Sequence, residues 1–114
     1  MRQPTFFEKD KTANTFDAER VVLYALGDFQ ARGKVLIGRD LPLDRLRGAL
    51  RRAAETLGIA ELDDELAVAT FESLGAQVRR VPAFVAKHPF RITVATALAE
   101  RALQFLHDAR ATEE

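Results

Sequence analysis

The segment 43–57 places the strongest constraint on the fold of this chain. Pro42 and Asp44 are typical of a helix start, and Gly58 is typical of a helix end. Between them, apolar residues recur at the spacing of one helix face: Leu43, Leu46, Leu50, Ala53, Ala54 and Leu57. This pattern predicts an amphipathic helix over 43–57 with its leucine face buried against the rest of the chain.

Apolar spacing also predicts a helix over about 17–31. Thr15 or Asp17 is expected to cap its start, and Gly33 is expected at its end. Gly27 lies inside this segment, where glycine weakens a helix.

Two more helices are expected in the second half of the chain. Acidic residues in a first turn favour a helix over about 63–74, although the run "LAVATF" within it also fits a buried strand. The segment 95–111 predicts the last helix, with an apolar stripe about half the circumference wide. The stripe consists of Leu98, Ala99, Ala102, Leu103, Phe105, Leu106 and Ala109.

Three short runs have the character of strands. "KVLIG" (34–38) is apolar and lies between glycines, which predicts a buried strand. "QVRRV" and "FRITV" predict two more strands, joined by a connection between Pro82 and Pro89. Since "QVRRV" has no purely apolar face, we expect it at the edge of a sheet.

The order of these segments predicts an α+β domain of two layers. A small sheet of three to four short strands would be covered by about four amphipathic helices. Residues 15–114 are expected to form this single domain, and residues 1–14 an N-terminal strand or a loose tail. A mostly all-α fold is the alternative if the short strands are loops.

Composition narrows the classes of function. The chain has no cysteine, which excludes thiol catalysis, disulfides and cysteine-ligated metals. It has no apolar run long enough for a membrane span and no signal-peptide core, so we expect a cytoplasmic protein without membrane contact. Arginine outnumbers lysine 13 to 4, and thermolabile residues are scarce, as in thermophile proteins.

The sequence offers no convincing catalytic or metal-binding constellation. His88 and His107 are the only histidines, and Ser73 does not lie in a nucleophile elbow. The carboxylates of residues 61–65 lack the spacing of a calcium loop, and capping of a helix start explains them. We therefore expect no enzymatic activity, no cofactor and no metal.

The charges of the chain are separated although their sum is zero. No acidic residue occurs between Glu72 and Glu100, whereas residues 61–65 are strongly acidic. The simplest hypothesis is that the acidic and basic segments pair with each other, within one chain or across a dimer. A nucleic-acid surface is the alternative, because arginine suits phosphate; its candidate contacts are Arg45, Arg51, Arg52, Arg79, Arg80, Lys87 and Arg91.

The connection between Pro82 and Pro89 carries two apolar residues, Phe84 and Val85. Apolar residues in a connection often mark a contact surface. Together with Arg79 of the expected edge strand, these two residues are the candidate partner contacts. The sequence therefore predicts a non-enzymatic interaction module that forms a homodimer or binds another protein, with an accessory nucleic-acid-binding protein as the alternative.

Overall fold

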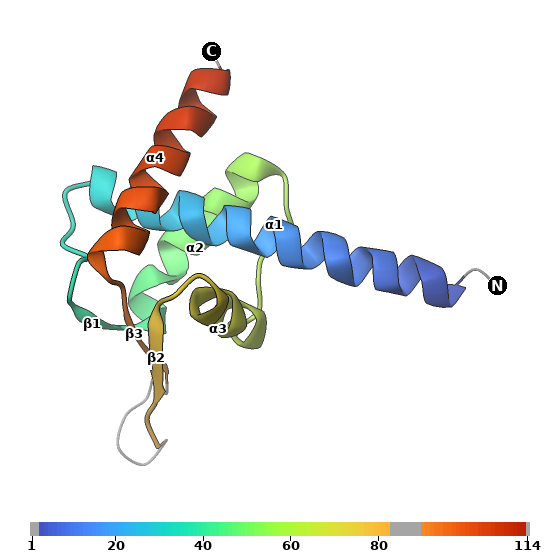
Figure 1. The fold of residues 1–114 in the computed structure, drawn as a ribbon, viewed down its shortest axis with the longest axis horizontal. Coiled ribbons are helices and arrows are strands. Elements are labelled where there is room, and N and C mark those ends of the chain that lie inside the picture. Colours follow the sequence, from blue (N-terminus) through green and yellow to red (C-terminus); the bar gives the residue numbers. More distant parts are fainter. Residues whose placement is uncertain (1–2, 83–89, 114) are drawn as a thin grey trace.

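The computed structural model describes the backbone of residues 3–82 and 90–113, and the side chains of residues 16–82 and 90–112. In this part of the chain, four helices pack against a three-stranded antiparallel sheet (Figure 1). The elements are α1 (Gln3–Ala31), β1 (Asp40–Pro42), α2 (Leu43–Leu57), α3 (Asp64–Ser73), β2 (Gln77–Arg80), β3 (Phe90–Thr93) and α4 (Thr96–Glu113). The α+β prediction is confirmed, and the all-α alternative is wrong.

Helix α2 has the predicted bounds and the predicted buried face. Leu46 and Leu50 are buried, and Leu57 is half-buried at the end of the helix. Gly58 follows in the left-handed conformation, with φ of 70°. The amide of Ile59 then donates to the carbonyl of Ala54 over 2.9 Å, which closes the helix end with a Schellman motif.

Helix α3 is confirmed in place of the alternative strand. The carboxylate of Asp63 accepts a hydrogen bond of 2.8 Å from the amide of Leu66 and so caps the first turn. Val68 and Phe71 are buried on the inner face of the helix. Gly75 adopts φ of 103° directly after the helix and redirects the chain into β2.

Helix α1 begins at Gln3, whereas the sequence led us to expect a strand or a loose tail over residues 1–14. The physical reason is that nothing interrupts the helix: neither glycine nor proline occurs from residue 5 to residue 26. Pro4 lies in the first turn, where its missing amide costs no hydrogen bond. The expected caps Thr15 and Asp17 are consequently internal positions of α1, whereas its end before Gly33 is as predicted.

The predicted buried strand at 34–38 is also wrong. Only Leu36 of this run is buried, while Val35 and Ile37 are exposed by 62% and 45%. Ile37 makes an isolated bridge to Val94, and the first strand forms later, as β1. Because only one of the three apolar side chains in this run is buried, packing would stabilise it too little as a central strand of a sheet.

The sheet has the order β1-β3-β2, and both pairings are antiparallel. Strand β3 is therefore central, and its Phe90 and Ile92 are buried, whereas Arg91 and Thr93, which alternate with them, are half-buried. Strand β2 lies at an edge of the sheet among the described residues, which confirms the prediction for "QVRRV". No helix of the described part of the chain is both long and apolar enough to cross a membrane.

Helix α1 runs through the middle of the helical layer and contacts the other three helices. Every residue from Val21 to Phe29 is buried. In Figure 1, α4 crosses α1 steeply and lies against it. Gln30 fastens this crossing, because its side-chain amide donates to the carbonyl of Ala99 over 3.0 Å.

Gly27 sets the distance between α1 and α4. A Cβ at this position would lie 2.6 Å from the carbonyl oxygen of Ala102 and 2.7 Å from the Cβ of Leu106. Such contacts are too short for any side chain, and one of them involves backbone that cannot easily move. The glycine that weakens the helix in isolation is therefore required for its packing.

Gly27→Ala should consequently lower the free energy of unfolding by about 1–3 kcal/mol through overpacking at the crossing. Gly48→Ala is the matched control in α2, where the nearest atom to a new Cβ is the Nη1 of Arg52 at 3.6 Å. This control should raise stability by up to about 1 kcal/mol, because alanine favours the helix. Urea denaturation of both variants measures the difference, and equal effects would contradict a tight crossing.

Candidate interaction surface

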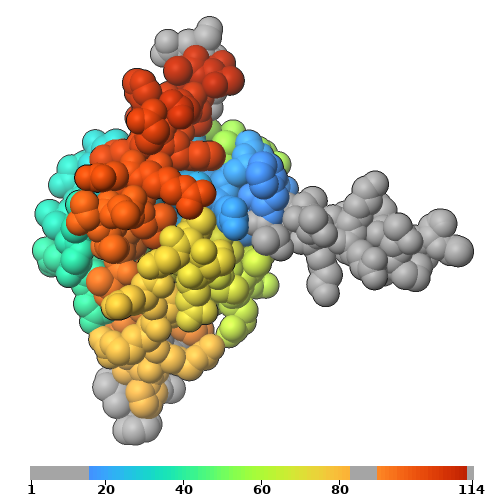
Figure 2. Space-filling view, in the orientation of Figure 1, coloured from blue at the N-terminus to red at the C-terminus, as the bar shows by residue number. Residues whose placement is uncertain are grey.

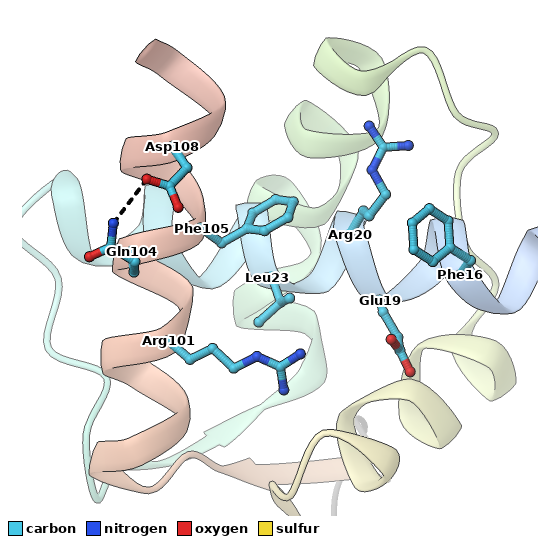
Figure 3. Close-up of a pocket in the computed structure, with 8 residues that line it drawn as sticks. All are labelled: Phe16, Glu19, Arg20, Leu23, Arg101, Gln104, Phe105 and Asp108. Carbon is cyan, nitrogen blue, oxygen red and sulfur yellow. Dashed lines mark hydrogen bonds between the residues drawn. The ribbon is translucent and has the colours of Figure 1, made fainter. Parts of the chain in front are cut away.

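A groove with a largely apolar lining lies between α1 and α4. It encloses about 490 Å³. Figure 3 shows the side chains that line it, which come from one turn after another of the two helices. They are Phe16, Glu19, Arg20, Leu23, Arg101, Gln104, Phe105 and Asp108. We call this hollow the α1–α4 groove.

The groove exists because the two helices diverge from their contact at Gly27. Leu23 lies between that contact and the open end, and only 5% of it is exposed. Phe105 is half-buried on the facing side of α4. Phe16 stands at the outer end and is 63% exposed, the largest exposed fraction among the large apolar side chains described. The groove therefore presents two aromatic rings to solvent.

The charged residues of the groove divide equally between the two signs. Glu19 and Arg101 come from opposite walls, and among the described residues neither forms an ion pair. Arg20 lies over the ring of Phe16, with 5.8 Å from its Cζ to the ring centroid. Asp108 accepts a hydrogen bond of 2.9 Å from Gln104. The rim thus carries two acids and two bases, and one of each has no partner in the described chain.

A second hollow continues the groove along α4. It shares Arg20, Phe105 and Asp108 with the first and adds Leu57 at the end of α2. Figure 2 shows α4 and the part of α1 from residue 16 onward side by side on one face of the molecule. The apolar surface therefore extends past Phe105 toward the C-terminal half of α4.

The last helix explains why this surface was missed from the sequence. Four residues of the predicted stripe are buried: Leu98, Ala99, Ala102 and Leu106. Phe105, however, reaches only the groove, and Leu103 is 41% exposed. The width of the stripe, about half the circumference of the helix, was the available signal for an exposed apolar surface. A helix that crosses another at one point buries a face narrower than this stripe, so part of the stripe stays exposed.

The predicted partner contacts lie only partly within the described residues. Phe84 and Val85 lie outside them, as does the nucleic-acid candidate Lys87. Arg79 lies on β2, and its Nη2 donates to the Oδ2 of Asp40 over 2.6 Å. That carboxylate also lies 3.5 Å from the Nε of Arg91. Asp40 of β1 thus holds arginines of the other two strands.

The remaining nucleic-acid candidates mostly face carboxylates of the same chain. Arg51 reaches Glu61 at 3.4 Å, and Arg80 reaches Glu65 at 3.7 Å. Arg45 forms no ion pair among the described residues. The hypothesis that the acidic segment 61–65 pairs with the basic segments is confirmed for pairing within one chain.

Arg47 makes the best-formed pair of this acidic segment. Its Nη1 donates to the Oδ1 of Asp64 over 2.9 Å, and its Nε donates to Asp44 over 3.4 Å. The hydrogen bond that Arg47 donates to Asp64 raises the pKa of the guanidinium above its ordinary value, against the opposing effect of burial. Both partners stay largely accessible to water, so the pair contributes little to stability.

Asp28 is the residue that the sequence analysis missed. It lies in the buried run of α1, and its side chain is 8% exposed. Arg32 donates from Nε to Oδ2 over 3.1 Å, and Arg52 of α2 donates to the same oxygen from Nε and Nη2. Arg110 of α4 lies 3.6 Å from Oδ1. The available signal was a carboxylate with apolar residues on both sides of it in the sequence. Folding can bury such a carboxylate only if positively charged or hydrogen-bonding side chains pair with it.

No metal site is visible in the described part of the chain, where no three side chains of histidine, aspartate or glutamate gather. His107 is exposed on α4, and His88 lies outside the described residues. The carboxylates of residues 61–65 instead cap α3 and pair with arginines.

Removal of the charge on Asp28 should be far more costly than removal of the charge on Asp64. Asp28→Asn loses charge-assisted hydrogen bonds at a buried site and should lower the free energy of unfolding by about 1.5–3 kcal/mol. Asp64→Asn removes an accessible ion pair and should change it by about 0–1 kcal/mol. Urea denaturation at neutral pH compares the two variants. A larger loss for Asp64→Asn would show that the acidic segment, rather than Asp28, holds the fold.

A scan of the chain against protein-family models, a search of curated proteins and a search of solved structures each find no match. The α1–α4 groove, the ion pairs on the sheet and the carboxylate of Asp28 are therefore the features from which a function can be inferred.

Proposed function

We propose that this protein is a non-enzymatic interaction module that forms a homodimer through the α1–α4 groove. The observation that carries the proposal is the combination of exposed aromatic rings and unpaired opposite charges in one hollow. Exposed apolar surface rimmed by polar groups is typical of protein interaction sites. Aromatic residues are also enriched where such interfaces are most tightly packed.

A second copy of the chain is the occupant that the charges favour. The rim carries equal numbers of acids and bases, so a twofold axis can bring each acid of one copy to a base of the other. In this arrangement Glu19 meets Arg101 of the partner subunit, and Arg101 meets Glu19 of the partner subunit. A strongly basic or acidic partner would meet repulsion from half of the same rim.

The apolar residues complete the proposed interface. Phe16 projects from α1 at the open end of the groove, whereas Phe105 and Leu23 form its inner part (Figure 3). A twofold arrangement allows Phe16 of each copy to enter the groove of the other. Burial of a phenylalanine ring is worth about 1.5–3 kcal/mol relative to exposure, and a dimer makes this contact twice.

A nucleic-acid-binding function is the second candidate. The order helix, strand, two helices and hairpin resembles that of winged helix-turn-helix domains, in which the second helix of the pair enters the major groove. Here that helix would be α3, whose N-cap is Asp63 and whose first turn carries Asp64 and Glu65. Three carboxylates at the entering end would repel phosphates. Binding through α3 is therefore disfavoured, and the likeness is one of topology alone.

Titration with duplex and single-stranded oligonucleotides at low salt separates the two candidates. The dimer proposal expects no salt-dependent binding through Arg79 or Arg80, since these two arginines already face carboxylates of the chain. Affinity that falls with salt and is lost in Arg79→Gln or Arg80→Gln would favour the nucleic-acid function instead.

Phe16→Ala should weaken the dimer and leave the fold of each chain intact. Sedimentation equilibrium of the wild type is expected to show dimers at tens of micromolar, and the variant should dissociate about tenfold or more readily. Val35→Ala is the matched control, since Val35 is exposed by 62%, almost as much as Phe16, but lies outside the groove. A wild type that remains monomeric at this concentration would overturn the proposal.

A charge exchange tests the pairing of Glu19 with Arg101 of the partner subunit. Glu19→Lys alone places like charges opposite each other twice in the dimer, and Arg101→Glu alone does the same with the opposite sign. Each variant should therefore be less dimeric than the wild type. An equimolar mixture should restore association as a heterodimer, because both contacts then join opposite charges. Failure of the mixture to associate more strongly than either variant would contradict this pairing.

A further inference from the structure

The carboxylate of Asp28 holds three arginines that come from three different parts of the chain. Arg52 belongs to α2, Arg110 belongs to α4, and Arg32 follows the last residue of α1. Their shortest contacts with Asp28 are 3.1 Å, 3.6 Å and 3.1 Å respectively. We call these three side chains the arginine cluster.

The arginine cluster carries more positive charge than its surroundings balance. Asp28 is the one carboxylate within ion-pair distance of any of the three guanidinium groups among the described residues. Glu55 lies one turn from Arg52 on α2 and pairs with none of them. The C-terminal end of α1 adds about half a negative charge. An excess of more than one positive charge therefore remains around Asp28.

The guanidinium groups keep donors available for a ligand. The side chains of Arg32, Arg52 and Arg110 are 51%, 44% and 51% exposed, although the carboxylate that they share is buried. Each guanidinium has five N–H donors, and Asp28 occupies a minority of the fifteen. The outer donors therefore face solvent above a fixed inner anion.

Asp28 also orients two of the three groups before any ligand arrives. It accepts from the Nε of both Arg32 and Arg52, and from the Nη2 of Arg52 as well. These contacts restrict the planes of the two guanidinium groups. A ligand that binds oriented side chains pays less for ordering them, so affinity per contact rises.

We propose that the arginine cluster is a binding site for a doubly charged oxyanion of the phosphate type, either free phosphate or a phosphomonoester. The guanidinium fork matches the oxygen spacing of phosphate, and the excess charge matches an anion rather than a neutral ligand. The site is separate from the α1–α4 groove, because none of its residues lines that groove. It therefore stands or falls independently of the proposed dimer.

Binding should be visible as stabilisation, because an anion that binds the folded chain raises its melting temperature. The wild type is melted in rising inorganic phosphate, with sodium chloride adjusted to constant ionic strength. A saturable increase in melting temperature is expected with phosphate and a much smaller one with acetate. Phenyl phosphate in place of phosphate distinguishes a monoester from the free ion. In arginine-side-chain NMR spectra, the Nε–H signals of Arg32 and Arg52 should shift with the same saturation.

Two variants and one control localise the site. Arg110→Gln should weaken phosphate affinity about tenfold, since one charge-assisted contact is lost. Arg32→Gln provides a second test if the first variant is unstable. Arg45→Gln removes the same charge from an exposed position of α2 that has no described ion pair, and it should leave the affinity unchanged. A phosphate effect that does not saturate, that acetate reproduces, or that Arg110→Gln and Arg32→Gln both retain would overturn the proposal.

Discussion

Burial of the middle of α1 is the constraint on which the rest of the structure depends. From Val21 to Phe29 every residue of this helix is buried, and the other three helices contact it. A helix in that position must pack closely against each neighbouring helix without a steric clash. Each of its buried polar side chains must also have a hydrogen-bond or ion-pair partner. Gly27 meets the first demand toward α4, and Asp28 meets the second by accepting from two arginines. Two adjacent residues thus determine how α2 and α4 are held.

Much of the fold could be predicted from the sequence because local signals agree with it. The leucine face of α2, the acidic start of α3 and the alternation along β3 each satisfy one rule of periodicity or capping. The hairpin strand β2 was placed at an edge because its mixed faces fit no buried position. These elements are short and bounded by proline, glycine or a capping residue, so their bounds follow from chemistry within a few positions.

The wrongly predicted strand at 34–38 and the missed residues share a different cause, namely contacts between residues far apart in the chain. Whether Val35 and Ile37 are buried depends on what lies above them, and periodicity does not carry that information. The same holds for Asp28, whose partner Arg52 is 24 residues away, and for the α1–α4 groove, whose walls are 78 or more residues apart along the chain. The predicted contacts Phe84 and Val85 lie outside the described residues, whereas the groove depends on Phe16 and Phe105, which the sequence analysis did not select.

The edge strand β2 has a consequence for the behaviour of the protein at high concentration. An edge strand exposes backbone groups that can pair with a strand of another molecule and begin aggregation. The chain has no net charge at neutral pH, so long-range repulsion does not keep copies apart. On β2 that protection falls to Arg79 and Arg80, the latter spread over the ring of Phe90 at 4.5 Å. Because the chain as a whole has no net charge, these two side chains act as local gatekeeper residues against aggregation at this edge.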